Sequence, residues 1–185
     1  MRLISVNLKR HLTALGLTVL LCGTAMAETA PPEMIEKLRS ASEGEAPRVA
    51  RELERVWARS GSAAMDLLLK RGRDALEAKE FGKAIEHLTA LTDHAPDFAE
   101  GFHARAEAYF RADLYGPALD DLQTALELNP LNYNAIFGLG VMMQEFGDTR
   151  RAADLYRRAL AIHPHHKDAR TALDYLKRDG IGREL

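Results

Sequence analysis

Apolar residues recur along this chain at the spacing of an α-helix. Between residues 47 and 59, Val49, Leu53, Val56 and Trp57 occupy positions i, i+4, i+7 and i+8, which places them on one face of a helix. Runs of alternating β-branched residues are absent from the sequence, whereas the good helix formers Ala, Leu, Glu and Arg recur throughout. The pattern predicts an all-α protein. We expect Trp57 to pack in the core, with a ligand contact as the alternative.

The helical pattern repeats with a fixed period. Pro96, Pro130 and Pro164 each follow a helical run, and the two intervals between them are equal. A residue that precedes proline is pushed out of the α region, so each proline ends a helix. We therefore expect three successive units of equal length, at residues 65–98, 99–132 and 133–166.

The same residue types recur at the same places when the three units are superimposed. The eighth place is small, the twentieth is alanine, and the fourth is large and apolar. Small side chains let two helix axes approach closely, and large apolar ones fill the gaps between neighbouring helices. The fourth place holds Leu68, Phe102 and Ile136, the eighth holds Gly72, Ala106 and Gly140, and the twentieth holds Ala84, Ala118 and Ala152.

This pattern resembles that of the tetratricopeptide-repeat (TPR) family, whose period equals the spacing of the three prolines. The resemblance implies an α-solenoid of antiparallel helix pairs, because one repeat cannot bury its own apolar face and must stack on others. The stretch 57–69 also resembles that of small exported TPR proteins of alphaproteobacteria. The repeats would occupy residues 63–166.

Two flanking segments complete the expected solenoid. Residues 28–62 should form an N-terminal helical pair, with helices near 33–42 and 47–59, that caps the first repeat. Residues 167–178 should form a C-terminal helix with Ala169, Leu173 and Leu176 on its inner side, followed by a tail to residue 185. A capping helix is expected because the last repeat would otherwise expose its inner face.

The first 27 residues have the three-part layout of a secretory signal peptide. A positive start that includes Arg2 and Arg10 precedes an apolar run from Leu12 to Leu21, and an Ala-x-Ala cleavage site ends at Ala27. The apolar run is short for a membrane span. We expect cleavage after Ala27 and a periplasmic or secreted protein without a stable membrane span, with an uncleaved anchor as the alternative.

Charge and cysteine content exclude several functions. The formal net charge is −2, which provides no basic surface for nucleic acid. Cleavage would remove Arg2, Lys9 and Arg10 and leave the mature chain at −5. It would also remove Cys22, so the mature chain would have no disulfide and no thiol chemistry.

The sequence contains no recognisable catalytic motif. A glycine-rich phosphate loop, a Gly-x-Ser-x-Gly elbow and a His-Glu-x-x-His pair are all missing. The pair Asp120 and Asp121 is interpreted as part of a solvated helix face. We expect no enzymatic activity and no cofactor. The alternative function is a periplasmic protein that binds a metal or small ligand through His163, His165 and His166, which otherwise lie solvated around the turn at Pro164.

The TPR resemblance implies a concave binding face lined by the first helix of each repeat. The face carries five acidic side chains against two arginines, so we expect a protein or peptide partner with apolar residues and some positive charge. Leu76, Phe110 and Val141 could instead pack between helices. The expected groove residues are Asp66, Leu69, Arg73 and Glu77 in the first repeat, Glu100, His103, Glu107, Phe110 and Arg111 in the second, and Asn134, Phe137, Val141, Gln144 and Glu145 in the third.

One mode of TPR recognition is not expected here. Some TPR co-chaperones clamp the C-terminal carboxylate of a partner with Lys, Asn and Arg at fixed groove places. The corresponding positions in this chain include Leu69, Ala104, Asn134 and Gly138, which lack the positive donors. We therefore expect a protein-interaction adaptor or scaffold that recognises its partner in another way.

Overall fold

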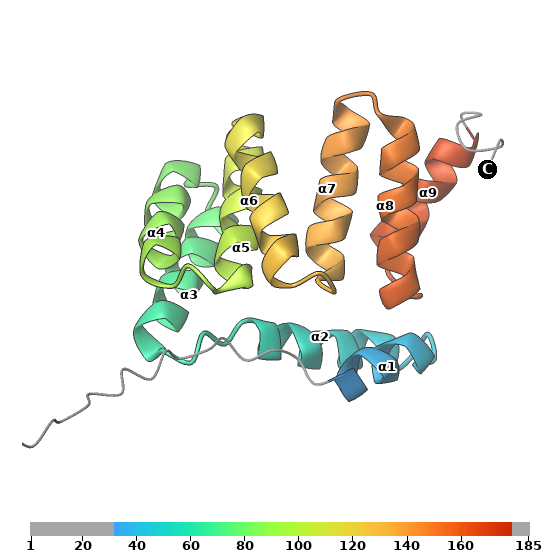
Figure 1. Cartoon of the computed structure of the whole chain (residues 1–185), viewed down its shortest axis with the longest axis horizontal. Helices are drawn as coiled ribbons and strands as arrows, with labels where there is room; N and C mark the ends of the chain where they lie inside the picture. The colour runs from blue at the N-terminus through green and yellow to red at the C-terminus, as the bar shows by residue number, and fades with distance from the viewer. Residues whose placement is uncertain (1–31, 179–185) are drawn as a thin grey trace, which may run out of the picture.

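The computed structural model describes residues 32–178, and within that range the chain forms nine α-helices and no strand. The expected signal peptide and C-terminal tail lie outside the described residues. Three antiparallel helix pairs stack side by side, and a last helix covers the third pair (Figure 1). The pairs are α3 (Ala63–Glu77) with α4 (Phe81–His94), α5 (Ala99–Arg111) with α6 (Tyr115–Leu128), and α7 (Tyr133–Glu145) with α8 (Thr149–Ile162), and the last helix is α9 (Lys167–Arg178).

The small residues of the repeat pattern lie where two helices of a pair come closest. A Cβ atom added to Gly72 would lie 2.4 Å from Cγ of Leu88, and one added to Gly140 would lie 2.6 Å from Cε1 of Tyr156. Leu88 and Tyr156 are themselves almost fully buried, so neither side chain has room to move aside. The close approach therefore requires a small side chain at this place, as the pattern predicts.

The turn inside each pair has the same backbone in all three repeats. Lys79 and Asp113 have φ of 60° and Gly147 has φ of 81°, which is left-handed backbone at the same place of each repeat. The following amide donates back across the helix end each time, with N–O distances of 2.8–2.9 Å to the carbonyls of Ala75, Tyr109 and Met143. This is the Schellman arrangement, which ends the first helix and starts the second.

One buried ion pair links three helices of the array. Arg105 in α5 donates from Nε and Nη2 to the two carboxylate oxygens of Asp121 in α6, at 2.7 and 2.8 Å, and from Nη1 to Oγ1 of Thr92 in α4 at 2.6 Å. The prediction that Asp121 belongs to a solvated face is wrong, because its side chain is only 8% exposed. Its place on the inner side of α6 opposite Arg105 could not be read from the acidic pair alone.

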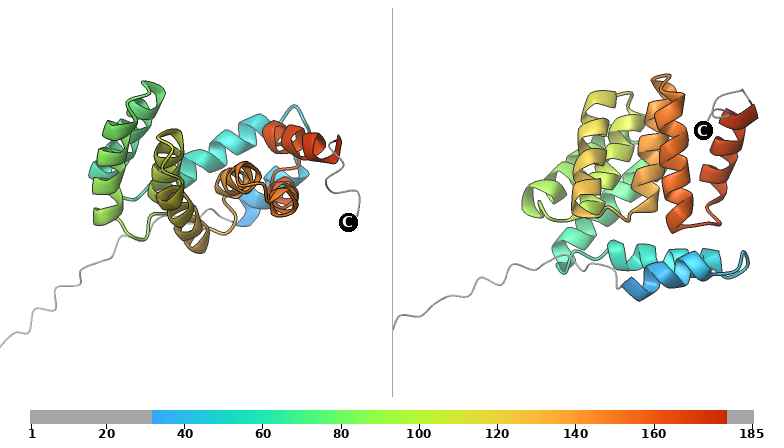
Figure 2. Two further views of the ribbon diagram at one scale, coloured as in Figure 1. Left: turned by 90° about the horizontal axis from the view of Figure 1, so that it is seen from above. Right: turned by 45° about the vertical axis from the view of Figure 1, so that its right-hand side comes forward.

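The N-terminal helices do not stack on the first repeat as predicted. Helices α1 (Pro32–Ser40) and α2 (Ala46–Trp57) run crosswise along one end of the upright helices (Figures 1 and 2). Their apolar face, which includes Leu38 and Leu53, packs in one core cluster with Tyr133 and Ile136 of α7, Ile162 of α8 and Ala169 of α9. The pair thus covers the third repeat and the start of α9.

Specific contacts explain why α2 lies against α7. The Trp57 ring lies 5.4 Å from the Tyr133 ring, centre to centre, and Trp57 is buried as predicted. The Tyr133 hydroxyl donates to Oε1 of Glu54 at 2.7 Å, and Nδ2 of Asn134 donates to the same oxygen at 3.0 Å. An aromatic residue at the start of α7 therefore supplies both an apolar and a polar contact for α2.

Helix α9 covers the outer side of α8, as predicted. Its residues Ala169, Leu173 and Leu176 are buried, while Lys167 and Lys177 are exposed. None of the helices within residues 32–178 has both the length and the apolar composition needed to cross a membrane.

Candidate binding groove

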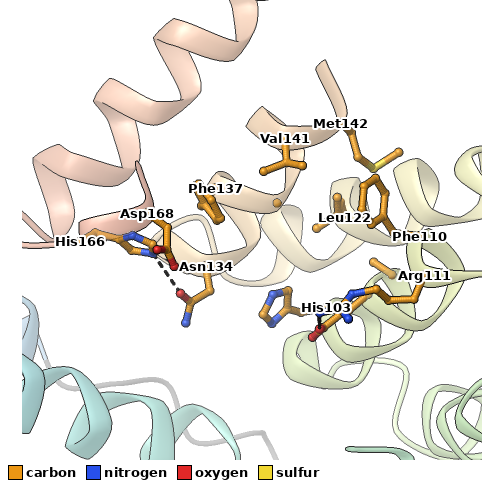
Figure 3. A pocket seen from close by; sticks show the side chains of 13 residues that line it. His103, Phe110, Arg111, Leu122, Asn134, Phe137, Val141, Met142, His166 and Asp168 are labelled. Atoms are coloured by element: carbon orange, nitrogen blue, oxygen red, sulfur yellow. Dashed lines mark hydrogen bonds and ion pairs between the residues drawn. The ribbon is translucent and has the colours of Figure 1, made fainter. Parts of the chain in front are cut away.

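Of two adjoining cavities among the described residues, the larger lies on the inner face of the array, between α5 and α7, and we call it the main cavity (Figure 3). Its volume is about 500 Å³, and it is open on one side. Leu122 of α6 contributes to its lining, so α5 and α7 are far enough apart for the cavity to reach the second helix layer. The residues that line it are His103, Ala106, Glu107, Phe110, Arg111, Leu122, Asn134, Phe137, Gly138, Val141, Met142, His166 and Asp168.

Apolar side chains form the floor of this main cavity, and polar side chains form its rim. Phe110 of α5 and Phe137 and Val141 of α7 belong to this apolar lining (Figure 3). At the rim Arg111 pairs with Glu107 at 3.1 Å, and Asp168 projects from α9. A cavity with an apolar floor and a few convergent polar groups is typical of a ligand or peptide site.

The structure brings half of the fourteen predicted groove residues together in the main cavity. They come from α5 and α7, and two further ones, Arg73 and Glu100, line an adjoining cavity described below. The seven in the main cavity are His103, Glu107, Phe110, Arg111, Asn134, Phe137 and Val141.

The other five predicted residues line neither cavity. Leu69 is 2% exposed and belongs to the core between α3 and α4. Asp66 accepts hydrogen bonds from the backbone and hydroxyl of Ser60, and Gln144 accepts one from the Tyr156 hydroxyl. Glu77 and Glu145 are exposed near the far ends of α3 and α7. The repeat positions therefore predict which residues lie on the inner side of each helix, but they do not predict which of those residues line a cavity.

Burial and ion pairing set the charge of the groove floor between α3 and α5. Burial alone would raise the pKa of Glu100, but His103, Arg73 and a hydrogen bond from Asn132 outweigh it and hold the pKa below its usual range. Burial likewise would lower the pKa of His103, but Glu100 outweighs it and raises that pKa. Nδ1 of His103 lies 3.2 Å from Oε1 of Glu100, and Arg73 pairs with the same oxygen. The negative charge of Glu100 is thus compensated by Arg73 and His103 of the protein itself.

A second cavity of about 360 Å³ adjoins the first at the α2 end of the groove. His103 and Asn134 line both cavities. Sequence reasoning missed its α2 residues, because the position of α2 along the array was not predictable from the repeat pattern. The lining comprises Arg51, Glu54, Arg55, Trp57, Ala58, Arg73, Glu100, His103 and Asn134.

The histidines near Pro164 do not form a metal site. His163 is buried rather than solvated, with its ring 5.0 Å from that of Tyr133. Both ring nitrogens of His166 are in use, since Nδ1 accepts from the backbone of Ala169 at 3.2 Å and Nε2 lies 3.3 Å from Oδ1 of Asn134. Within residues 32–178 no three His, Cys, Asp or Glu side chains gather around one point.

Comparison with known proteins identifies the repeats. The profile of the tetratricopeptide-repeat family matches residues 103–167, which span most of the second and third helix pairs. Residues 103–167 are tetratricopeptide repeats. The TPR match agrees with the stacked helix pairs, the three equivalent turns and the small residues at the helix contacts.

TPR-containing relatives extend the likeness beyond the matched profile. A TPR repeat-containing protein of Rhizobium etli is 25% identical over 155 residues, which cover 81% of this chain and 76% of the relative. Human serine/threonine-protein phosphatase 5 is 28% identical over 103 residues, which cover 56% of this chain but only 21% of the phosphatase. The likeness to the phosphatase therefore concerns a small part of that enzyme.

Solved structures share the TPR fold. The structure of MamA superimposes with a TM-score of 0.59 at 21% identity, over 83% of this chain and 88% of MamA. The first TPR of RPAP3, solved with an HSP90 peptide, superimposes with a TM-score of 0.61 at 24% identity, over 64% of this chain and 94% of that domain. At these identities the two structures show a shared fold.

Proposed function

We propose that this TPR protein is an adaptor or scaffold that binds an apolar segment of a partner protein in the groove between α5 and α7. The observation that carries the proposal is the cavity of about 500 Å³ with Phe110, Phe137 and Val141 in its apolar lining. A solenoid that already buries its core has no structural need for an open apolar recess of this size. The partner's side chains would fill the recess and release water from it.

The rest of the proposal concerns where and how the protein acts. Its partner would meet it in the periplasm or outside the cell, on the strength of the signal-peptide pattern of residues 1–27. It would act by binding alone, because the partly buried His103 is paired with Glu100 and the lining of the main cavity contains no Ser, Thr, Cys or Lys side chain. TPR structures with a bound peptide, such as that of RPAP3 with its HSP90 peptide, support this kind of role.

A groove-filling substitution tests the proposal. Gly138 lies on the cavity lining, and an added Cβ would make ordinary contact with Leu122 at 3.6 Å. We expect Gly138→Leu to keep the fold and to fill part of the cavity. The measurement is photocrosslinking from Val141 in cells that make the full chain. We expect a discrete crosslinked product that is at least about fivefold weaker in Gly138→Leu, because displaced apolar contacts of this size are worth more than about 1 kcal/mol.

The matched control is Gly82→Leu on α4, where an added Cβ meets nothing within 4 Å. This variant makes the same chemical change away from the groove and should leave the crosslinked product unchanged. Equal yields from wild type and Gly138→Leu would show that the groove is not the binding site.

A further inference from the structure

The α2 end of the groove carries two arginines without partners. Arg51 and Arg55 are exposed, and within residues 32–178 neither side chain forms an ion pair or a hydrogen bond. Other basic residues of the N-terminal pair do find partners, since Lys37 and Arg48 lie 3.6 and 3.8 Å from Glu52. Arg51 and Arg55 are four residues apart, so they lie on the same face of α2, and both line the second cavity.

The acidic residues of this cavity do not bond to the two arginines and only partly offset their charge. Oε1 of Glu54 accepts from the Tyr133 hydroxyl and from Asn134. Glu100 is buried and accepts from Arg73 and Asn132 and faces His103. With Arg73 included, three arginines line the cavity against two internally bonded carboxylates. The local charge is therefore positive, whereas the three repeats considered alone predict an acidic bias.

The arginine-lined cavity is continuous with the apolar groove. His103 and Asn134 belong to the lining of both cavities, and they lie at the end of the main cavity that faces α2 (Figure 3). A segment that fills the recess beside Phe110 and Val141 therefore passes His103 and Asn134 and reaches Arg51 and Arg55. An arginine guanidinium recognises a carboxylate through paired, charge-assisted hydrogen bonds.

We propose that Arg51 and Arg55 bind a carboxylate of the partner segment whose apolar side chains occupy the main groove, a proposal that rests on the proposed function. The carboxylate belongs to an aspartate, a glutamate or a C-terminus next to the apolar residues. The site is made by α2, a helix outside the repeats. It therefore differs from the carboxylate clamp of TPR co-chaperones, whose groove positions in this chain include Leu69, Ala104, Asn134 and Gly138. The site fixes the direction in which the partner segment lies in the groove, because the acidic end of the segment lies at α2.

Display selection on the intact folded chain tests this proposal. A library of short random peptides with free C-termini is selected separately on wild type, on Arg51→Gln/Arg55→Gln, and on Gly138→Leu. We expect wild type to enrich peptides that combine apolar residues with Asp, Glu or a nearby C-terminus. The double arginine variant should keep the apolar enrichment and lose the acidic one. The same acidic enrichment on both proteins would overturn the proposal.

Binding of one selected peptide then measures the contribution of the site. We expect Arg51→Gln/Arg55→Gln to weaken binding about 10- to 100-fold, and replacement of the peptide's acidic group by its amide to remove this difference. The control, Arg71→Gln/Arg150→Gln, removes two exposed arginines that line neither cavity. An equal loss in the control would reduce the effect to net charge and refute the site. Peptide selection that Gly138→Leu does not change would instead refute the proposed function.

Discussion

Three residues of very different chemistry hold the same left-handed backbone in the turns of this TPR array. Lys79, Asp113 and Gly147 all have positive φ, and only glycine adopts it without a steric penalty. Asp is tolerated better than Lys because its short side chain can bond locally, and Oδ1 of Asp113 accepts from the Tyr115 hydroxyl at 2.9 Å. The first repeat therefore carries the most strained of the three turns.

This difference predicts opposite effects of two substitutions. Lys79→Gly should stabilise the protein by about 0.5–1 kcal/mol, and Gly147→Ala should destabilise it by about 1 kcal/mol. Urea unfolding monitored by circular dichroism measures both. Gly116→Ala is the control, because Gly116 lies in α6 without positive φ and without a neighbour within 4 Å. A loss of stability in Lys79→Gly, or a loss in Gly116→Ala as large as that in Gly147→Ala, would contradict the account.

The residues that could be predicted from the sequence are those whose role the repeat itself dictates. Gly72, Gly140 and the buried alanines of the twentieth place are set by contacts inside one helix pair, which recur from repeat to repeat. Leu69 was expected in the groove but is buried, because whether an inner-face side chain stays open depends on the angle to the next pair. That angle depends on the packing of several helices, so it cannot be predicted from the residue type at a single position.

At the scale of whole helices, the array is joined by the Arg105–Asp121 pair as well as by apolar packing. The pair and the Thr92 hydroxyl connect α4, α5 and α6 in a region where both charged side chains are mostly buried. Removal of one partner leaves the other charge buried without compensation.

We expect Asp121→Ala to destabilise the protein by about 3–5 kcal/mol, because Arg105 would remain buried and unpaired. The comparison variant is Asp74→Ala, which removes an exposed pair with Lys70 at 2.6 Å and should cost no more than about 0.5 kcal/mol. Thermal unfolding of both variants gives the two values. A similar, small loss in each would show that the buried pair is not important for joining the helices.

The helical character of the N-terminal pair was predictable, but its position was not. Val49, Leu53 and Trp57 have the spacing of one buried face, and the structure buries all three. Two surfaces of a solenoid could cover that face, the open side of α3 or the ends of α7 and α8. The choice depends on Tyr133, which offers α2 both a ring and a hydroxyl, and whose role emerges only when the third repeat is folded. The arginines of the second cavity were missed for the same reason.

At the scale of the whole molecule, acid should weaken the contact between the N-terminal pair and the array. His163 lies in this contact against Tyr133, and its Nδ1 is buried without a hydrogen-bond partner in residues 32–178. Burial lowers its pKa to about 4, His166 and His165 act in the same direction, and Glu54 of α2 opposes them. The pKa of His166 is also lowered by burial, although Asp168 and Glu54 oppose the shift.

A pKa that is lower in the folded chain gives stability that is complete at neutral pH and lost as the pH falls. For His163 the loss runs from its ordinary pKa of 6.5 down to about 4. The full contribution is up to about 3 kcal/mol. His103, whose pKa is raised, acts in the opposite sense and gains stability as the pH falls.

We therefore expect the melting temperature of wild type to fall between about pH 7.5 and pH 5, and to fall less in His163→Gln, which cannot be protonated. His94→Gln is the matched control, because His94 is exposed at the end of α4 and should leave the acid sensitivity unchanged. An equal fall in melting temperature for His163→Gln and wild type over this pH range would contradict the role of His163.

The position of α1 and α2 also affects how this chain can fold during synthesis. In a simple solenoid each unit packs on the one made just before it, so the chain can become ordered from its N-terminus as it emerges. Here Glu54 bonds to Tyr133, 79 residues later, and the apolar face of α2 also packs against Ile162. The first two helices therefore leave the ribosome well before their packing surface has formed. The apolar face of this helical hairpin must stay exposed without aggregating until α7 and α8 have left the exit tunnel.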